Sequence, residues 1–251
     1  MLDYDTLITP SPIKLSIGTL RKPKLLEISN MGFSKFDSYK ILLKLSSDMV
    51  DNKIKESLGL NPNSEDAIKI YDIIKLDESL REAYLDMFNF FFEEKTIYSD
   101  GYFFTLKSNE NKELTELTTD DIKGIIGVEN FEEVLFAIQQ TCCIASKEKK
   151  EKPKFKNEKA RKLYERMQKS KSMNNNDLNS LSLPNIISAV SNFHPSLNPI
   201  NIYDITVFQL YDSFNRLQLG EAYWMNKMRV SVWGDEKGKF KSSLWYDYLG
   251  K

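Results

Sequence analysis

The chain is poor in the side chains from which most active sites are built. Its 251 residues include one histidine, His194, and two cysteines, Cys142 and Cys143, which are adjacent. Histidine and cysteine, alone or with carboxylates, carry most acid–base and nucleophilic catalysis. A structural zinc site needs four nitrogen or sulfur ligands at recognisable spacing. The scarcity argues against a Ser-His-Asp triad and a structural zinc site, so we expect no enzyme, no cofactor and no metal.

The sequence also lacks a large net charge and a long hydrophobic run. The formal net charge is −1, which gives no global indication of nucleic-acid binding. No apolar run approaches the roughly 20 residues that a membrane-spanning helix needs. The first five residues carry acid where a secretory leader would carry base. Two adjacent cysteines cannot join distant segments. We therefore expect a soluble, intracellular protein that does not enter a membrane.

Helical hydrophobic spacing dominates the first 146 residues. The apolar residues between 80 and 91 fall on one helical face: Leu80, Ala83, Tyr84, Met87, Phe88 and Phe91. Leu85, Phe90 and Phe92 lie off that face. Two interpretations follow. The helix is buried at the centre of the protein, or one face packs in the core and another against a second subunit.

The clearest β signal is Asp100-Gly101 between the aromatic runs 96–99 and 102–105. Such a pair predicts a tight hairpin. Alternation in residues 13–17 predicts a short strand, either an arm that lies on a partner or a strand that packs on its own domain. We expect a short helix over 118–126 and a capped helix from Asn130, whose apolar stripe places Cys142 in the core. Isolated glycines such as Gly124 indicate turns.

Residues 147–171 contain twelve lysines and arginines against four glutamates, a local charge of +8. With the polar residues up to 182 this composition is typical of an exposed linker, and the spacing after Ala160 indicates a charged helix within it. A nucleic-acid contact or a docking arm for an acidic partner are the alternatives. The candidate contact residues are Lys149, Lys150, Lys152 and Lys154.

The C-terminal part begins with a helix signature at Ser182-Leu183-Pro184. Thr206 and Gln209 resemble a capping box for a long helix, whose predicted apolar face comprises Val207, Leu210, Tyr211, Phe214 and Leu217. Residues 230–233 are either a strand or the end of that helix. His194 follows the first helix, where it can face the C-terminal dipole.

Acidic pairs offer a second functional hypothesis, a metal-dependent nuclease. Glu93-Glu94-Lys95, or Asp100 with Lys107, contain the acids and lysine that such a site needs. Asp100 is better explained by its turn, and the pair Asp120-Asp121 by the start of a helix.

The segment 201–217, NIYDITVFQLYDSFNRL, resembles a pattern in proteins encoded among the tail genes of phages and phage-like particles of Gram-positive bacteria. Similar elements occur there in the same order: the opening IGTLRKPKL at 17–25, the charged helix 160–167, the helix 183–190 and Trp245. The resemblance implies a virion structural or tail-assembly protein, in some cases a chaperone, without catalytic residues. Its partners would be tail tube, tape measure, sheath or baseplate proteins. It would be found in the host bacterial cytoplasm during assembly, or in the virion.

Together these patterns predict a mainly α protein with a minor β-hairpin (α+β). We expect a helical domain at 1–146, a basic polar linker at 147–182 and a smaller helical domain at 183–251. We expect a non-enzymatic phage tail protein, with a DNA-associated factor or nuclease that uses 147–171 as the alternative. Seven aromatic residues are candidates for the interface, with the core as the alternative for each: Phe88, Phe91, Tyr102, Phe104, Phe208, Tyr211 and Trp245.

Overall fold

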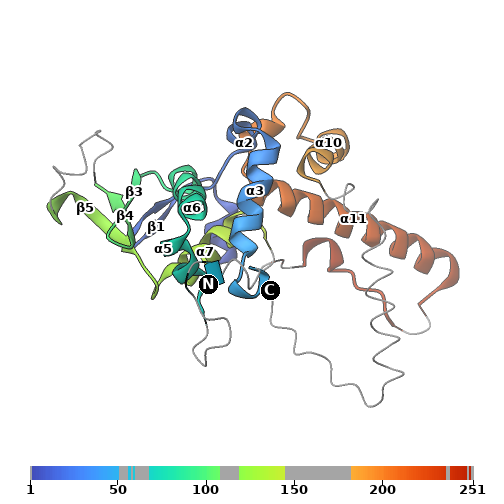
Figure 1. The fold of residues 1–251 in the computed structure, drawn as a ribbon. Coiled ribbons are helices and arrows are strands. Elements are labelled where there is room, and N and C mark those ends of the chain that lie inside the picture. Colours follow the sequence, from blue (N-terminus) through green and yellow to red (C-terminus); the bar gives the residue numbers. More distant parts are fainter. Residues whose placement is uncertain are drawn as a thin grey trace, which may run out of the picture. The chain divides into compact units, whose positions relative to one another are not determined.

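The computed structural model describes residues 2–50, 56–57, 59, 68–107, 119–144, 182–235, 238–247 and 249. They form helices and two small antiparallel sheets (Figure 1), which confirms the predicted class, mainly α with minor β. The chain divides into two compact units. The N-terminal unit comprises 1–146 with 206–208, and the C-terminal unit comprises 147–205 with 209–251. The charged helix predicted after Ala160 lies outside the described residues, and so do the four candidate lysines, Lys149, Lys150, Lys152 and Lys154.

The elements of the N-terminal unit are α1 (Tyr4–Ile8), β1 (Ile13–Leu15), β2 (Gly18–Leu20), α2 (Leu25–Met31), α3 (Phe33–Lys44), η1 (Ser47–Met49), α5 (Ile70–Leu76), α6 (Glu78–Phe91), β3 (Thr96–Ser99), β4 (Tyr102–Leu106), η3 (Thr119–Asp121), β5 (Ile122–Ile126) and α7 (Phe131–Thr141). The C-terminal unit contains α10 (Leu183–Phe193), η4 (Ile202–Asp204), most of α11 (Val207–Trp233) and η5 (Leu244–Tyr246).

Helix α6 is the centre of the N-terminal core. It begins where the Asp77 carboxylate accepts a hydrogen bond from the Leu80 amide at 3.0 Å. The Phe88 ring packs edge-on against Phe103 of β4 and Phe131 of α7, at centroid distances of 5.1 and 6.2 Å. Burying an aromatic side chain of this size stabilises the fold by about 1.5–3 kcal/mol. The structure thus supports the interpretation of this segment as a central buried helix.

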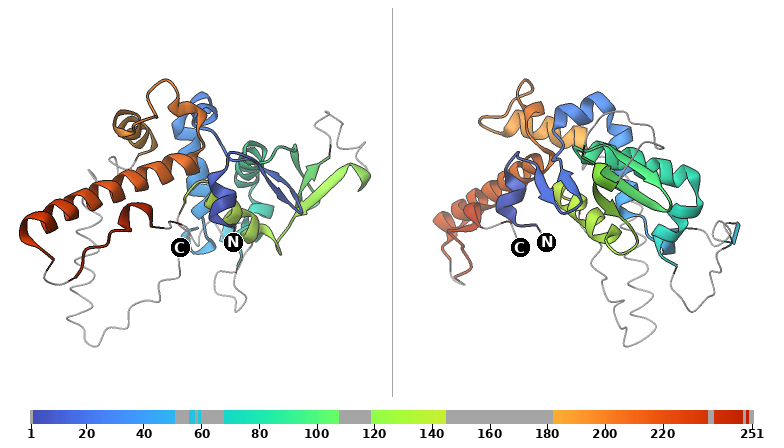
Figure 2. Two further views of the ribbon diagram at one scale, coloured as in Figure 1. Left: turned by 180° about the vertical axis from the view of Figure 1, so that it is seen from behind. Right: turned by 90° about the vertical axis from the view of Figure 1, so that its left-hand side faces the viewer.

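The predicted hairpin is confirmed. Asp100 and Gly101 both have positive φ angles, 48° and 83°, and they connect β3 to β4 in the register Ser99 to Tyr102. Residues 122–126, predicted as part of a short helix, instead form β5 on the free edge of β4. The segment is rich in isoleucine and contains Gly124, a composition that favours a strand once a partner edge is available. Figure 2 shows this three-stranded sheet from two further sides.

The N-terminal hairpin β1–β2 packs on its own unit, so the interpretation of residues 13–17 as an arm on a partner is not needed. Ile17 is buried, and its carbonyl accepts a hydrogen bond from the Thr105 hydroxyl. A Cβ atom added at Gly124 would lie 2.3 Å from the Cα of Ile17. Gly124 therefore permits a close approach of two backbones and does not mark a turn, as the sequence had indicated.

A partly exposed ion pair helps to hold the same hairpin on the sheet. Glu94 accepts hydrogen bonds from the backbone amide of Thr19, at 2.7 Å, and from the ammonium group of Lys123. Burial raises the pKa of Glu94, but the hydrogen bonds from Lys123 and Thr19 lower it by more, so the net pKa lies below the usual value. The carboxylate is thereby held in its charged form.

The last helix of the N-terminal unit, α7, carries Cys142 into the core, as predicted. This thiol is 2% exposed, and burial raises its pKa to about 12, which makes it an unreactive structural cysteine. The helix begins after Asn130, as predicted, but the predicted side-chain cap at Asn130 is wrong. The Asn130 side chain accepts a hydrogen bond from the Gly127 amide at 2.8 Å and donates one to the Ile125 carbonyl at 2.8 Å, and so closes the turn that precedes the helix.

In the C-terminal unit, α10 begins at the predicted Ser182-Leu183-Pro184 and buries its predicted apolar side, including Ile186, Ile187 and Val190. Residues 230–233 are helical and end α11. The first residues of α11 belong to the N-terminal unit. Thr206 forms a β-bridge with Lys24, and the Val207 amide donates a hydrogen bond to the Pro23 carbonyl at 3.1 Å.

Candidate protein-interaction surface

Three of the predicted interface aromatics are buried in the N-terminal unit. Phe88 and Phe91 have no exposed surface, so their assignment is corrected to the core: a side chain without exposed surface cannot contact a partner in this fold. Phe208 is 9% exposed, and its ring packs edge-on against Tyr4 at 5.9 Å. These side chains stabilise the unit and offer no binding surface.

Two more candidates lie on the hairpin. Tyr102 is 43% exposed, and Phe104 is half-buried with its ring 6.3 Å from that of Tyr102. Tyr102 borders a hollow of about 550 Å³. Both Lys75 and Glu129 also line this hollow, so charges of both signs surround the tyrosine. Such a lining suits water better than an apolar partner.

The single histidine has a structural position. His194 follows α10, as predicted, and its Nδ1 atom accepts hydrogen bonds from the amides of Ser196 and Leu197 at 3.2 and 3.1 Å. These bonds shape the turn after the helix, and they occupy the ring nitrogen that a general base would use.

The acidic residues of the nuclease hypothesis do not converge. Glu94 is held by Lys123 and Thr19, Asp100 occupies the hairpin turn, and Asp120 lies in η3. Within the described parts of the chain, no group of three or more His, Cys, Asp or Glu residues is arranged to hold a metal ion.

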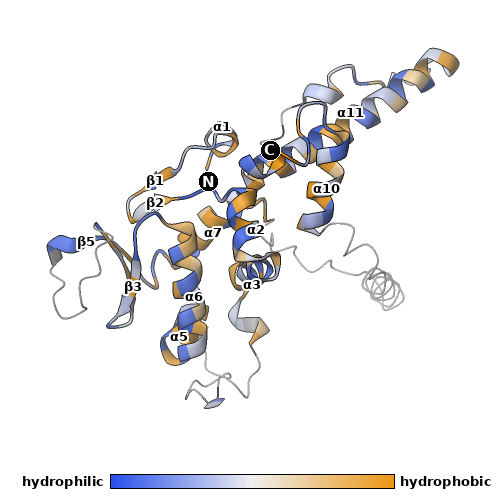
Figure 3. Cartoon of the chain, turned by 90° about the horizontal axis from the view of Figure 1, so that it is seen from above, coloured by the Kyte–Doolittle hydropathy of each residue, from blue (hydrophilic) through white to orange (hydrophobic). Residues whose placement is uncertain are grey.

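The second half of α11 exposes an apolar stripe, which we call the methionine stripe: Met225, Met228 and Val232. Their exposed fractions are 71%, 67% and 69%. Spacings of three and four residues place them on one side of the helix. Figure 3 shows hydrophobic residues recurring along α11 to its C-terminal end. Large apolar groups gathered on one exposed surface are typical of an interaction site, whereas scattered ones are normal.

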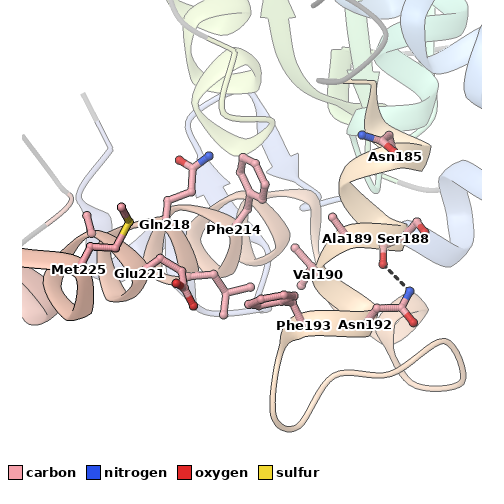
Figure 4. Close-up of a pocket in the computed structure, with 12 residues that line it drawn as sticks. Asn185, Ser188, Ala189, Val190, Asn192, Phe193, Phe214, Gln218, Glu221 and Met225 are labelled. Atoms are coloured by element: carbon pink, nitrogen blue, oxygen red, sulfur yellow. Dashed lines mark hydrogen bonds between the residues drawn. The ribbon is translucent and has the colours of Figure 1, made fainter. Parts of the chain in front are cut away.

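An apolar groove of about 610 Å³ lies between α10 and α11 at the N-terminal end of this stripe. Its walls include Phe193 from α10 and Phe214, Leu217 and Met225 from α11. Figure 4 shows Phe193 of α10 close to Glu221 of α11, with Phe214 and Met225 further along α11 on either side. Phe193 is 68% exposed, so the groove is open to a ligand from outside.

A second depression, which we call the aromatic groove, also lies on α11 and shares Leu217 with the first. It has a volume of about 760 Å³ and is lined by four aromatic rings among its residues: Tyr223, Trp224, Trp245 and Tyr246. Trp224 and Trp245 are 56% and 53% exposed. Trp245, from η5, is the predicted interface residue that the structure places in an open groove.

The aromatic groove is electropositive. Arg216 and Lys227 both line it, and none of its described lining residues is acidic. The Lys227 ammonium lies 4.6 Å from the centre of the Trp224 ring, a cation–π contact. Arg216 donates a hydrogen bond to the Asp247 carbonyl at 2.7 Å, which attaches the C-terminal segment to the helix. The site thus combines exposed aromatic rings with positive charge.

Sequence reasoning identified Trp245 but missed Trp224 and the methionine stripe. The predicted apolar face of the long helix ended at Leu217, and Tyr211, another interface candidate, is half-buried on it. The missing signal was present in the sequence: Met225, Met228 and Val232 continue the helical spacing from Phe214 through Gln218 and Glu221. Two polar residues in that series hid the continuation.

Residues 169–249 match a family described as the YomV second domain, which belongs to a phage-derived, prophage protein family. The matched range contains α10, α11 and η5, and therefore both grooves and the methionine stripe. This similarity associates the chain with phages. No curated protein and no solved structure shows a significant match. None of the described helices is long and apolar enough to cross a membrane.

Proposed function

We propose that this protein is a structural or assembly protein of a phage tail, which acts through protein–protein contacts and catalyses no reaction. The similarity of residues 169–249 to a phage-derived domain supports the phage association. The observation that carries the proposal further is the aromatic groove, which lies within that range. Exposed tryptophans and tyrosines beside an arginine are the residue types that dominate binding energy at protein interfaces.

The composition of the groove specifies the partner's chemistry. Apolar side chains would pack against Trp224 and Trp245, and an acidic side chain would pair with Lys227 or Arg216. The partner is therefore an apolar segment with at least one acidic residue, carried by a tail tube, tape measure, sheath or baseplate protein. The protein would meet it in the cytoplasm of the host bacterium during assembly, and remain with it or leave when the particle is finished.

The test is binding of the purified full-length chain to each purified tail protein, measured by titration calorimetry. We expect at least one tail protein to bind. The double variant Trp224→Ala, Trp245→Ala should weaken that binding by about 30-fold or more, because truncating one hot-spot residue costs about 2 kcal/mol. Lys227→Glu should weaken it further by charge repulsion.

Trp233→Ala provides a matched control, since Trp233 is 75% exposed on the same helix but does not line the aromatic groove. It should leave binding unchanged. Binding of no tail protein at any concentration would contradict the proposal. A double variant that binds as tightly as the natural chain would show that the aromatic groove is not the contact surface.

A further inference from the structure

Most of the methionine stripe faces away from the aromatic groove. At 100° per residue, Met225 and Val232 lie about 160° and 140° around α11 from the groove-lining residue Lys227. Met228 lies nearer to the aromatic groove, about 40° from Trp224. A tail protein seated in the aromatic groove would therefore leave Met225 and Val232 uncovered. Within the described part of the chain these three side chains stay exposed, so they form a surface that is available to a further partner.

Two charged residues of opposite sign lie beside the stripe at equal distances along the helix from Met225. Glu221 lies four residues before Met225, and Arg229 lies four residues after it. Both are exposed, and neither has an ion-pair partner among the described residues. If two α11 helices pair antiparallel about an axis at Met225, Glu221 of each copy lies level with Arg229 of the other. A parallel pair would place like charges together, which is unfavourable.

The apolar surfaces are self-complementary about the same point. The groove wall at Leu217 and Gln218 lies seven to eight residues before Met225, and the apolar end at Val232 and Trp233 lies seven to eight residues after it. The antiparallel arrangement brings the apolar end of each helix to the open groove of the other. A two-fold interface requires that one surface match itself in this way.

We propose that the partner of the methionine stripe is a second copy of this chain, bound through an antiparallel α11–α11 interface with a two-fold axis beside Met225. The contact segment from Leu217 to Trp233, symmetric about Met225, is about 24 Å long. An interface of this length is at the small end of specific ones, so the dimer forms reversibly and its amount depends on concentration. This inference goes beyond the proposed function, because self-association needs no tail protein.

Analytical ultracentrifugation of the purified full-length chain tests the pairing. We expect a monomer–dimer equilibrium. Glu221→Arg alone, or Arg229→Glu alone, should weaken dimerisation by about tenfold or more, because each creates two like-charge contacts. The double variant Glu221→Arg, Arg229→Glu restores opposite charges across the axis and should recover the natural affinity. Met225→Asp should abolish the dimer, because two carboxylates then meet at the axis.

Lys227→Glu is the matched control. It makes the same change of charge as Arg229→Glu on the same helix but on the other side, and it should leave dimerisation unchanged. A chain that remains monomeric up to about 100 μM, a double variant that does not recover, or a control that weakens as much as Arg229→Glu would overturn the proposal. Trp224→Ala, Trp245→Ala should still dimerise, which separates this result from a failure of tail-protein binding.

Discussion

In the N-terminal unit, Phe88, Phe91 and Phe103 have no exposed surface, whereas in the C-terminal unit Trp224, Trp233 and Trp245 each expose more than half of theirs. The first group is enclosed because α6 is covered by the sheet on one side and by α7 on another. Within the described residues, the second half of α11 has no such cover along the methionine stripe. Aromatic content alone therefore does not show whether a segment supplies a core or a binding surface.

The two units therefore differ in what their aromatic residues contribute. A buried aromatic cluster contributes to the free energy of unfolding, and its removal leaves a cavity. An exposed cluster contributes little to folding and is available to a partner. We therefore propose that the N-terminal unit supplies stability and that the C-terminal unit, which holds the match to the phage-derived domain, supplies contacts.

Replacing one aromatic residue in each unit should separate these roles most strongly. Phe88→Ala should lower the free energy of unfolding by about 3–5 kcal/mol, the usual cost of removing a buried ring. Trp233→Ala should change it by less than about 0.5 kcal/mol. Urea denaturation followed by circular dichroism measures both. Similar losses of unfolding free energy for the two variants would contradict the distinction between a buried and an exposed aromatic residue.

Gly124→Ala tests how closely the N-terminal unit is packed. Because the new Cβ atom would lie 2.3 Å from the Cα of Ile17, the hairpin or the sheet must shift. We expect a loss of about 2–3 kcal/mol in the free energy of unfolding. Gly220→Ala, on α11, is the matched control, since a Cβ atom there meets nothing within 4 Å. An unchanged free energy for Gly124→Ala would contradict the described approach of Ile17.

The Glu94–Lys123 pair predicts a pH dependence confined to the N-terminal unit. Since the folded pKa of Glu94 lies below the unfolded value near 4.5, the charged carboxylate stabilises the fold above that value. The contribution is lost as the pH falls through the folded pKa. Glu94→Gln should cost about 1–2 kcal/mol at neutral pH, a modest figure because Lys123 is partly exposed.

Unfolding of the natural chain and of Glu94→Gln at a series of pH values gives the measurement. The difference between the two chains should shrink towards zero in acid. A difference that stays constant across this range would show that the pair does not hold the carboxylate in its charged form.

The smallest effect is expected from the basic segment. Changing Lys149, Lys150, Lys152 and Lys154 to glutamate should leave binding of tail proteins unchanged, since the aromatic groove lies elsewhere. DNA binding, measured by fluorescence anisotropy at rising salt, should be weak in the natural chain. Tight, salt-dependent binding that the four substitutions remove would instead favour the DNA-associated alternative.

The sequence was sufficient to predict the elements in which local pattern and tertiary environment agree. The Asp100-Gly101 hairpin and the central helix with Phe88 are of this kind. Residues 122–126 were missed because a short apolar segment after an acidic pair resembles the start of a helix, and the pairing with the edge of β4 that makes it a strand is not visible in the local sequence. Gly124 was misinterpreted because its neighbour, Ile17, is distant in sequence.

The candidate site was harder to predict, because spacing shows which residues share a helical face but not what covers that face. Phe88 and Trp245 were equal interface candidates in the sequence, yet one is enclosed and the other is exposed. Trp224 and the methionine stripe lay beyond the predicted apolar face, since Gln218 and Glu221 interrupt the series. Only the packing around α11 shows which of its faces are covered and which are exposed.

The most direct test of the central claim is capture from a nuclease-treated lysate of the native phage host, with bound proteins identified by mass spectrometry. The natural chain and the Trp224→Ala, Trp245→Ala variant serve as parallel baits. We predict that the natural chain retains tube, tape measure, sheath or baseplate proteins and that the variant loses them. Recovery of no tail protein by the natural chain, or equal recovery by both baits, would contradict the assignment of the aromatic groove as the surface that binds the tail.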